Sequence, residues 1–320
     1  MKYIIRPVLP TSRQIQEIDE TKYTEITNAR KLAWDILLIK ELFSYVVGNF
    51  LQLEGEIKKI ESEAKKHSNT FQKRVRSGSF RLDNSYAFNL LTFNLLSTCR
   101  TYIELFDYRG QNEKREAFNH QQNIRNILEN IKAEYHDKNF ICMFFWALRN
   151  YAQHHSSPII GSPLNISNTI IKIGFSVDAS RILSRLTEAQ RKKLDISDSI
   201  HNFRIYLEEN FNYYNQQELQ NYPKQLNIRP IIEEYILLIE KIQDKATEKL
   251  DTELIKAKEI LTKNVKCYCQ NDSPESAFEI FIQNDETQEL EEHFDISLKL
   301  INQWEETIKK YSYLKPTTNC

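Results

Sequence analysis

Two adjacent histidines follow an arginine and an asparagine at the end of an apolar segment, residues 140–155. Three residues separate Asn150 from His154, and His155 comes directly after it. An imidazole accepts or donates a proton near neutral pH, and a guanidinium can hold a phosphate through two parallel hydrogen bonds. Arg149, Asn150 and the two histidines therefore suit acid–base chemistry on a phosphate ester.

A single helix is expected to position these side chains. Apolar residues at intervals of three and four predict a helix with one buried stripe, formed by Phe140, Ile141, Phe144, Phe145 and Leu148. Pro158 ends the helix, because proline cannot continue the hydrogen-bond ladder. Asn150 and His154 then share a face, whereas Arg149 and His154, five residues apart, diverge by about 140°.

A second copy of the helix could place its histidine beside the arginine of the first copy. An isologous interface places the same patch of both subunits at a two-fold axis. The arginine and the histidine of the two copies can then surround one phosphate. The sequence therefore favours a homodimer with a composite site.

Arg149, Asn150 and His154 together resemble the R-x4-6-H motif of the HEPN superfamily (higher eukaryotes and prokaryotes nucleotide-binding). His155 fits the same motif with one more intervening residue. Residues 89–104 are similar to the helix that packs beside the motif helix in bacterial members, and the resemblance covers about residues 25–155. Members are α-helical domains that often act as ribonucleases, so the resemblance implies a HEPN-like helical bundle.

The resemblance implies an endoribonuclease that needs neither a metal ion nor a cofactor. The ribose 2′-OH attacks the adjacent phosphate, and the products carry a 2′,3′-cyclic phosphate and a 5′-hydroxyl. Arg149 would bind the phosphate, His154 would act as acid or base, and Asn150 would orient them, with His155 as the alternative imidazole. RNA is the implied substrate. Bacterial members act as toxins or antiviral defence effectors, which implies an antitoxin or a defence-system partner protein.

Two other interpretations stay open. Arg149 and His154 would also be explained as cations that cap the negative end of a helix dipole. A HEPN-like protein can also keep the fold without catalysis and bind a nucleotide or RNA, or act as a scaffold.

Further basic residues lie in the N-terminal part of the chain. Residues 1–155 contain 23 Lys and Arg against 18 Asp and Glu, a net charge of +5, whereas the whole chain carries −1. Between residues 67 and 82 the helical spacing breaks down, and Lys73, Arg74 and Arg76 lie among aromatic residues. Such a segment suits binding of a phosphate backbone, although a solvated charged connector has the same pattern.

Arg100 is the fourth candidate for substrate binding. It lies four residues before Glu104 on a polar face of the expected helix 83–108. If that face meets the end of the motif helix, Arg100 and Glu104 can orient Arg149 or His154. An ordinary surface ion pair has the same spacing.

Composition favours a cytoplasmic, mainly helical protein. Glycines number six and prolines eight in 320 residues, and the five cysteines are scattered. No uninterrupted apolar run reaches the roughly 18–20 residues of a membrane span, and the N-terminus lacks the core of a signal peptide. Cys267 and Cys269 lack the second pair that a zinc site needs, and the side chains of His154 and His155 point apart, so no metal site is predicted.

The expected fold is mainly α, a helical bundle with long helices and a small β-hairpin after the motif helix. We expect an HEPN-like bundle in residues 1–160, and residues 161–320 completing or extending it. Residues 1–23 are expected to be irregular, and the charged residues 54–66 to project from the core. Helices are expected at 23–66, 83–108, 111–135, 136–155, 179–186, 194–214, 230–264 and 288–313, a hairpin within 158–177, and a strand at 278–282.

Overall fold

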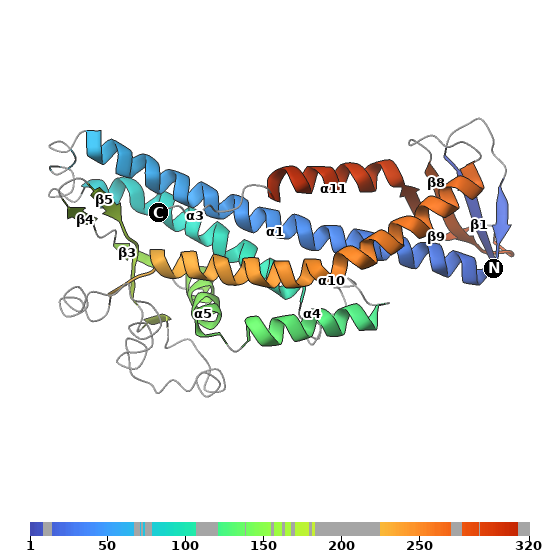
Figure 1. Ribbon diagram of the computed structural model, residues 1–320, viewed down its shortest axis with the longest axis horizontal. Helices are drawn as coiled ribbons and strands as arrows, with labels where there is room; N and C mark the ends of the chain where they lie inside the picture. Colours follow the sequence, from blue (N-terminus) through green and yellow to red (C-terminus); the bar gives the residue numbers. More distant parts are fainter. Residues whose placement is uncertain are drawn as a thin grey trace. The chain divides into compact units, whose positions relative to one another are not determined.

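The computed structural model describes residues 1–8, 15–66, 71, 73, 79–106, 121–137, 139–154, 157–161, 164–167, 170–178, 181–182, 225–269, 277–287 and 289–312. Helices predominate among them, with antiparallel strands between (Figure 1). The helices are α1 (Glu20–Lys66), α3 (Ser79–Glu104), α4 (Gln122–Tyr135), α5 (Phe140–His154), α10 (Arg229–Cys269) and α11 (Leu298–Ser312). The strands are β1 (Lys2–Pro7), β2 (Gln16–Ile18), β3 (Ile159–Gly161), β4 (Leu164–Ser167), β5 (Ile170–Ile173), β6 (Ser176–Asp178), β7 (Gln225–Asn227), β8 (Ala277–Gln283) and β9 (Leu290–Ser297). The predicted mainly helical class is therefore confirmed.

The chain forms two compact units, each built from segments that lie far apart in the sequence. The first unit comprises Met1–Ser44, Leu105–Glu129 and Gln243–Lys315, and the second comprises Tyr45–Glu104, Asn130–Ile242 and Pro316–Cys320. Helices α1 and α10 each contribute one part to the first unit and the other part to the second. The expected division into residues 1–160 and 161–320 stays a prediction.

A four-stranded antiparallel sheet, in the order β2-β1-β8-β9, belongs to the first unit. β1 pairs with β8 along its whole length, from Lys2 opposite Gln283 to Pro7 opposite Phe278. Alternate residues form a buried face that includes Ile5, Phe278, Ile280 and Ile296. The irregular leader expected over residues 1–23 is wrong, because β1 and β2 are strands and α1 already begins at Glu20.

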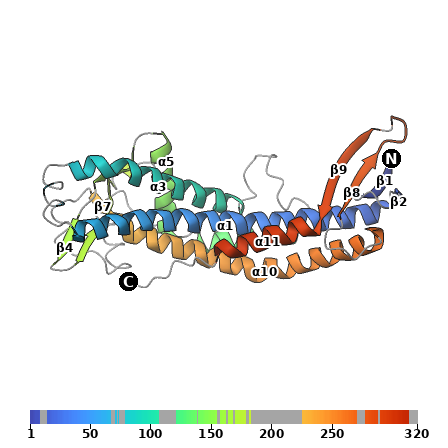
Figure 2. The same ribbon diagram turned by 90° about the horizontal axis from the view of Figure 1, so that it is seen from above.

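β9 occupies the first part of the helix expected at residues 288–313, so that expectation is wrong there. The hairpin of β8 and β9 leads directly into α11 (Figure 2). Phe294 and Ile296 alternate with polar residues, as in a strand with one apolar face. α11 packs on α1 through Trp304, whose ring centroid lies 4.6 Å from that of Trp34.

The second unit packs α5 together with the second part of α1, with α3 and with the first part of α10. Buried side chains come from all four helices and include Leu53, Phe88, Leu95, Phe144, Phe145, Ile232 and Tyr235. The ring of Tyr235 stacks on that of Phe145, with centroids 4.6 Å apart. α5 runs across α3 and contacts it (Figures 1 and 2). The buried helix predicted at the motif is therefore confirmed.

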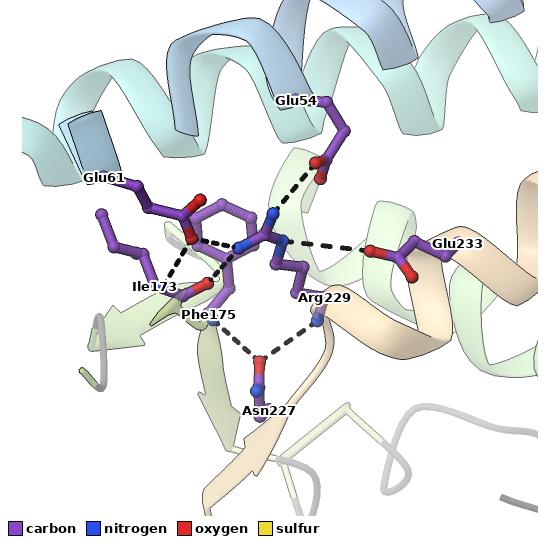
Figure 3. Close-up of polar contacts among 7 residues, drawn as sticks. All are labelled: Glu54, Glu61, Ile173, Phe175, Asn227, Arg229 and Glu233. Atoms are coloured by element: carbon purple, nitrogen blue, oxygen red, sulfur yellow. Dashed lines mark hydrogen bonds and ion pairs between the residues drawn. The ribbon is translucent and has the colours of Figure 1, made fainter. Parts of the chain in front are cut away.

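Residues 54–66 of α1 belong to the second unit's core, so the expectation that they project from the fold is wrong. Two of their carboxylates hold Arg229, the first residue of α10 (Figure 3). Nη1 of Arg229 donates to Oε1 of Glu61 at 2.6 Å and to the carbonyl oxygen of Ile173 at 2.8 Å, and Nη2 donates to Oε2 of Glu54 at 3.0 Å. The carboxylates bind a largely buried guanidinium in place of solvent.

Antiparallel strands follow the motif helix, as predicted. β4 and β5 form a hairpin, β3 pairs with β6, and β7 adds a third strand in the order β3-β6-β7. Phe175 lies edge-on to Phe88 of α3, with ring centroids 4.8 Å apart, so the strands pack on the helices. Apart from residues 181–182, which are helical, the helices expected at 179–186 and 194–214 lie outside the described residues.

One window of α1 is long and apolar enough to cross a membrane by length and composition alone. It passes this test although charged residues interrupt the apolar run. Of the window, 44% is buried in the fold. Core helices of globular proteins have the same character, so α1 is weak support for a membrane span.

Candidate active site

Helix α5 has a defined beginning and a buried middle. Oδ1 of Asn139 accepts a hydrogen bond from the backbone N of Ile141 at 2.9 Å, which satisfies one of the free donors at the helix start. Phe144, Phe145 and Leu148 are at most 1% exposed. The helix therefore gives rigid support to its last residues, 149–154, which we call the polar turn.

Arg149 is half-buried, and its positive charge is only partly balanced. Among the described residues its buried Nε has no hydrogen-bond partner, and its Nη1 makes only a long contact of 3.4 Å with Oδ1 of Asn150. Burial lowers the pKa of the Arg149 guanidinium, and the charge of Arg100 lowers it further, while Glu104 acts in the opposite direction. Because an arginine stays protonated in proteins, a bound anion would stabilise this group.

His154 is the last residue of α5 and is exposed. Since α5 is helical throughout, His154 lies about 140° around the axis from Arg149 and about 40° from Asn150. Within the described part of the chain, neither Arg149 nor His154 hydrogen-bonds a backbone carbonyl, and the interpretation of the two as cations at the negative end of the helix dipole stays open. His155 lies outside the described residues, so the choice between the two imidazoles stays open.

α3 brings a second guanidinium to α5. Nε of Arg100 donates to Oε1 of Glu104 at 2.7 Å, and the guanidinium carbon of Arg100 lies 5.8 Å from the centroid of the Trp146 ring. Trp146 precedes Arg149 by three residues and therefore lies on the same side of α5. The sequence left open whether the polar face of α3 meets the motif helix, and it gave no signal for Trp146 beyond this spacing.

The chain also contacts α3 after the polar turn. Oδ1 of Asn89 accepts a hydrogen bond from the backbone N of Ile159 at 3.0 Å, and its Nδ2 donates to the carbonyl oxygen of Ile159 at 3.3 Å. α3 thus contacts the chain on both sides of the polar turn, at Trp146 and at Ile159.

A buried group of charges lies between α4 and α5. Nδ1 of His136 is 3.1 Å from Oδ1 of Asp137, and Nζ of Lys132 is 3.4 Å from the same oxygen. Burial lowers the pKa of His136, and Lys132 and Arg100 act in the same direction, whereas Asp137 opposes them. Burial disfavours the charged form of Asp137, but the hydrogen bond from His136 and the charge of Lys132 outweigh it and lower the pKa to about 2. A neutral histidine and an ionised aspartate therefore connect α4 to the motif helix near pH 7.

The other predicted RNA-binding residues are described only in part. Lys73 is exposed, whereas Arg74 and Arg76 lie outside the described residues. Their role in binding stays a prediction. Arg100 is the candidate whose surroundings are defined, and they include Arg149.

Chemically, the polar turn combines a group that can bind an anion with a group that can transfer a proton. Arg149 can bind an anion, and His154 can exchange a proton with water or substrate. In the described part of the chain, the one group of three His, Cys, Asp or Glu side chains close enough to share a metal ion belongs to the first unit, not to this turn.

Comparison of the chain with family models, with curated proteins and with solved structures found no match. The resemblance to the HEPN superfamily therefore depends on Arg149, Asn150 and His154, on the similarity of residues 89–104 and on the helical class of the fold.

Proposed function

We propose that this protein is a HEPN-like, metal-independent endoribonuclease that works in the cytoplasm as a homodimer. The observation that carries the proposal is Arg149, a half-buried guanidinium whose Nε has no hydrogen-bond partner within the described ranges, in the same polar turn as the exposed imidazole of His154. A phosphodiester is an anion that such a guanidinium could bind while an imidazole of the second copy transfers the proton.

The proposed reaction uses the substrate's own 2′-OH as nucleophile. An imidazole removes the proton of this hydroxyl or supplies one to the departing 5′-oxygen, and near neutral pH histidine can do either. Arg149 stabilises the negative charge that develops on the phosphoryl oxygens. Asn150, four residues before His154, orients the imidazole or the phosphate, and Arg100 adds positive charge next to Arg149.

A dimer is proposed because one polar turn is an incomplete site. Arg149 and His154 of one chain diverge by about 140° around the helix axis. A two-fold axis near the polar turn would let the two copies share one phosphate. Action as a toxin or antiviral effector controlled by a partner protein follows from the HEPN likeness and is part of the proposal.

Cleavage of structured RNA in excess EDTA tests the proposal. Arg149→Ala and His154→Ala should each reduce the rate by about 100-fold or more, because each removes a group that acts on the transition state. Arg181→Ala is the control, since this side chain is 68% exposed and lies outside the polar turn. The rate for His155→Ala assigns the catalytic imidazole.

Circular dichroism and gel filtration should show that the variants keep their fold and oligomeric state. Equal cleavage by the wild-type chain, Arg149→Ala and His154→Ala would exclude this site. RNA binding without cleavage, lost in Arg149→Ala, would favour the non-catalytic HEPN-like alternative.

A further inference from the structure

The sheet of the first unit carries three side chains whose nitrogen and oxygen atoms converge. Glu279 of β8 pairs with Asp295 of β9, and His293 precedes Asp295 by two residues, so all three lie on one face of the sheet. Nε2 of His293 lies 3.9 Å from Oε1 of Glu279 and 3.6 Å from Oδ1 of Asp295. The three atoms that could bind a metal ion all lie within 4.8 Å of one another.

These distances fit a shared metal ion better than hydrogen bonds. Hydrogen bonds between nitrogen and oxygen measure about 2.7–3.2 Å, so the imidazole bonds to neither carboxylate. Two atoms that each lie about 2.1 Å from a tetrahedral Zn²⁺ are about 3.4 Å apart. Small movements of the side chains would place all three atoms around one ion.

Neighbouring residues orient two of the three side chains. Arg6 lies opposite Glu279 in the sheet, and its Nε donates to Oε2 of Glu279 at 2.8 Å, which leaves Oε1 for the imidazole side. The ring of His293 lies edge-on to Phe281, with centroids 6.4 Å apart. Hydrogen bonds such as that from Arg6 orient ligating carboxylates in known metal sites.

The negative charge at this position also favours binding of a cation. Glu279 and Asp295 lie directly opposite each other on the neighbouring strands β8 and β9, so their carboxylates repel each other. Arg6 balances one of these negative charges, and Arg30, whose Nε donates to the backbone oxygen of Asp295 at 2.8 Å, offsets part of the other. A divalent ion would be attracted by the charge that remains.

We propose that Glu279, His293 and Asp295 bind a divalent transition-metal ion, for which Zn²⁺ is the best match, with water completing its coordination. Imidazole nitrogen and carboxylate oxygen are both ordinary zinc ligands. His293 is 44% and Asp295 69% exposed, so an ion can enter from solvent. The bound ion would connect β8 to β9. This metal site is independent of the proposed ribonuclease activity, because the residues of that activity belong to the second unit.

Titration of the full-length, tag-free, EDTA-treated protein with zinc chloride in a calorimeter tests this site. One ion should bind per chain, and its binding should raise the thermal unfolding temperature. His293→Ala should weaken binding at least about tenfold and abolish the thermal shift, and Glu279→Gln and Asp295→Asn should also weaken binding. Glu286→Gln is the matched control, because this exposed carboxylate of the same hairpin lies outside the group.

Exposed Cys267 is a second candidate zinc ligand in the described part of the chain, and Cys267→Ser should leave zinc binding unchanged. The proposal is overturned if the wild-type chain binds no zinc, if His293→Ala binds it as tightly as the wild type, or if Cys267→Ser abolishes binding. Circular dichroism establishes that His293→Ala is folded. Should that variant not fold, the titration of Asp295→Asn decides by the same criterion.

Discussion

Replacing Arg229 with methionine tests how far the second unit depends on one buried network of charges. Methionine keeps an unbranched side chain but removes the hydrogen bonds to Glu61, to Glu54 and to the carbonyl oxygen of Ile173 (Figure 3). The side chains of Arg229, Glu54 and Glu61 are only 15%, 12% and 18% exposed. Water can therefore solvate the remaining carboxylates only in part.

We expect Arg229→Met to lower the free energy of unfolding by about 3 kcal/mol. Removing one partner of a buried ion pair costs about 3–5 kcal/mol, and partial exposure puts this case at the lower end. For a folding unit of this size the loss corresponds to about 6–12 °C in Tm. Arg229→Lys keeps the charge but not the forked geometry, and should cost about half as much.

Urea unfolding followed by circular dichroism measures this loss, and hydrogen–deuterium exchange of residues 229–242 locates it. Arg181→Met is the control, because the Arg181 side chain is 68% exposed, so water weakens its ion pair with Asp178 to at most about 1 kcal/mol. Adding Glu54→Gln and Glu61→Gln to Arg229→Met should restore at least about 1 kcal/mol, since both unpaired charges are then gone. A loss no larger than that of Arg181→Met would refute the role given to Arg229.

Further variants test local contacts within the second unit. A Cβ on Gly174 would lie 2.7–2.8 Å from side-chain atoms of Asn227, so Gly174→Ala should cost about 1–3 kcal/mol in urea unfolding, whereas Gly55→Ala, in open space on α1, should be neutral or stabilising. Burial lowers the pKa of His136, so below about pH 6.5 the unfolded chain binds a proton that the folded chain does not. The free energy of unfolding should therefore fall as the pH is lowered from 7 to 5. It should fall less steeply in His136→Gln. Asn139→Ala removes the cap of α5 and should lower stability by about 1 kcal/mol; unchanged thermal unfolding would contradict that role.

The sequence predicted the helices, whose hydrogen bonds join residues close together in the chain, better than the strands, whose partners are distant. The apolar spacing was sufficient to predict α1, α5 and α10. The reason is that each hydrogen bond of a helix joins residues four apart in the sequence. β1 was missed, since its partner β8 lies more than 270 residues away, with Lys2 opposite Gln283.

The same distinction holds for the polar groups. Arg149, Asn150 and His154 are visible because they lie within one turn and a half of a helix. Arg229 gave no signal, because its partners Glu54 and Glu61 are 175 and 168 residues away. A charged stretch such as residues 54–66 looks solvated until the residue that neutralises it is known.

Single-turnover cleavage of one synthetic RNA in excess EDTA, next to the same strand with a 2′-deoxyribose at the cleaved position, decides whether Arg149 and His154 form a ribonuclease site. We predict that the RNA is cut to a 2′,3′-cyclic phosphate, that the deoxy-substituted strand is not cut there, and that Arg149→Ala and His154→Ala cut the RNA about 100-fold more slowly or slower still. Equal cleavage of both strands, or cleavage that requires a divalent metal ion, would contradict the proposed chemistry.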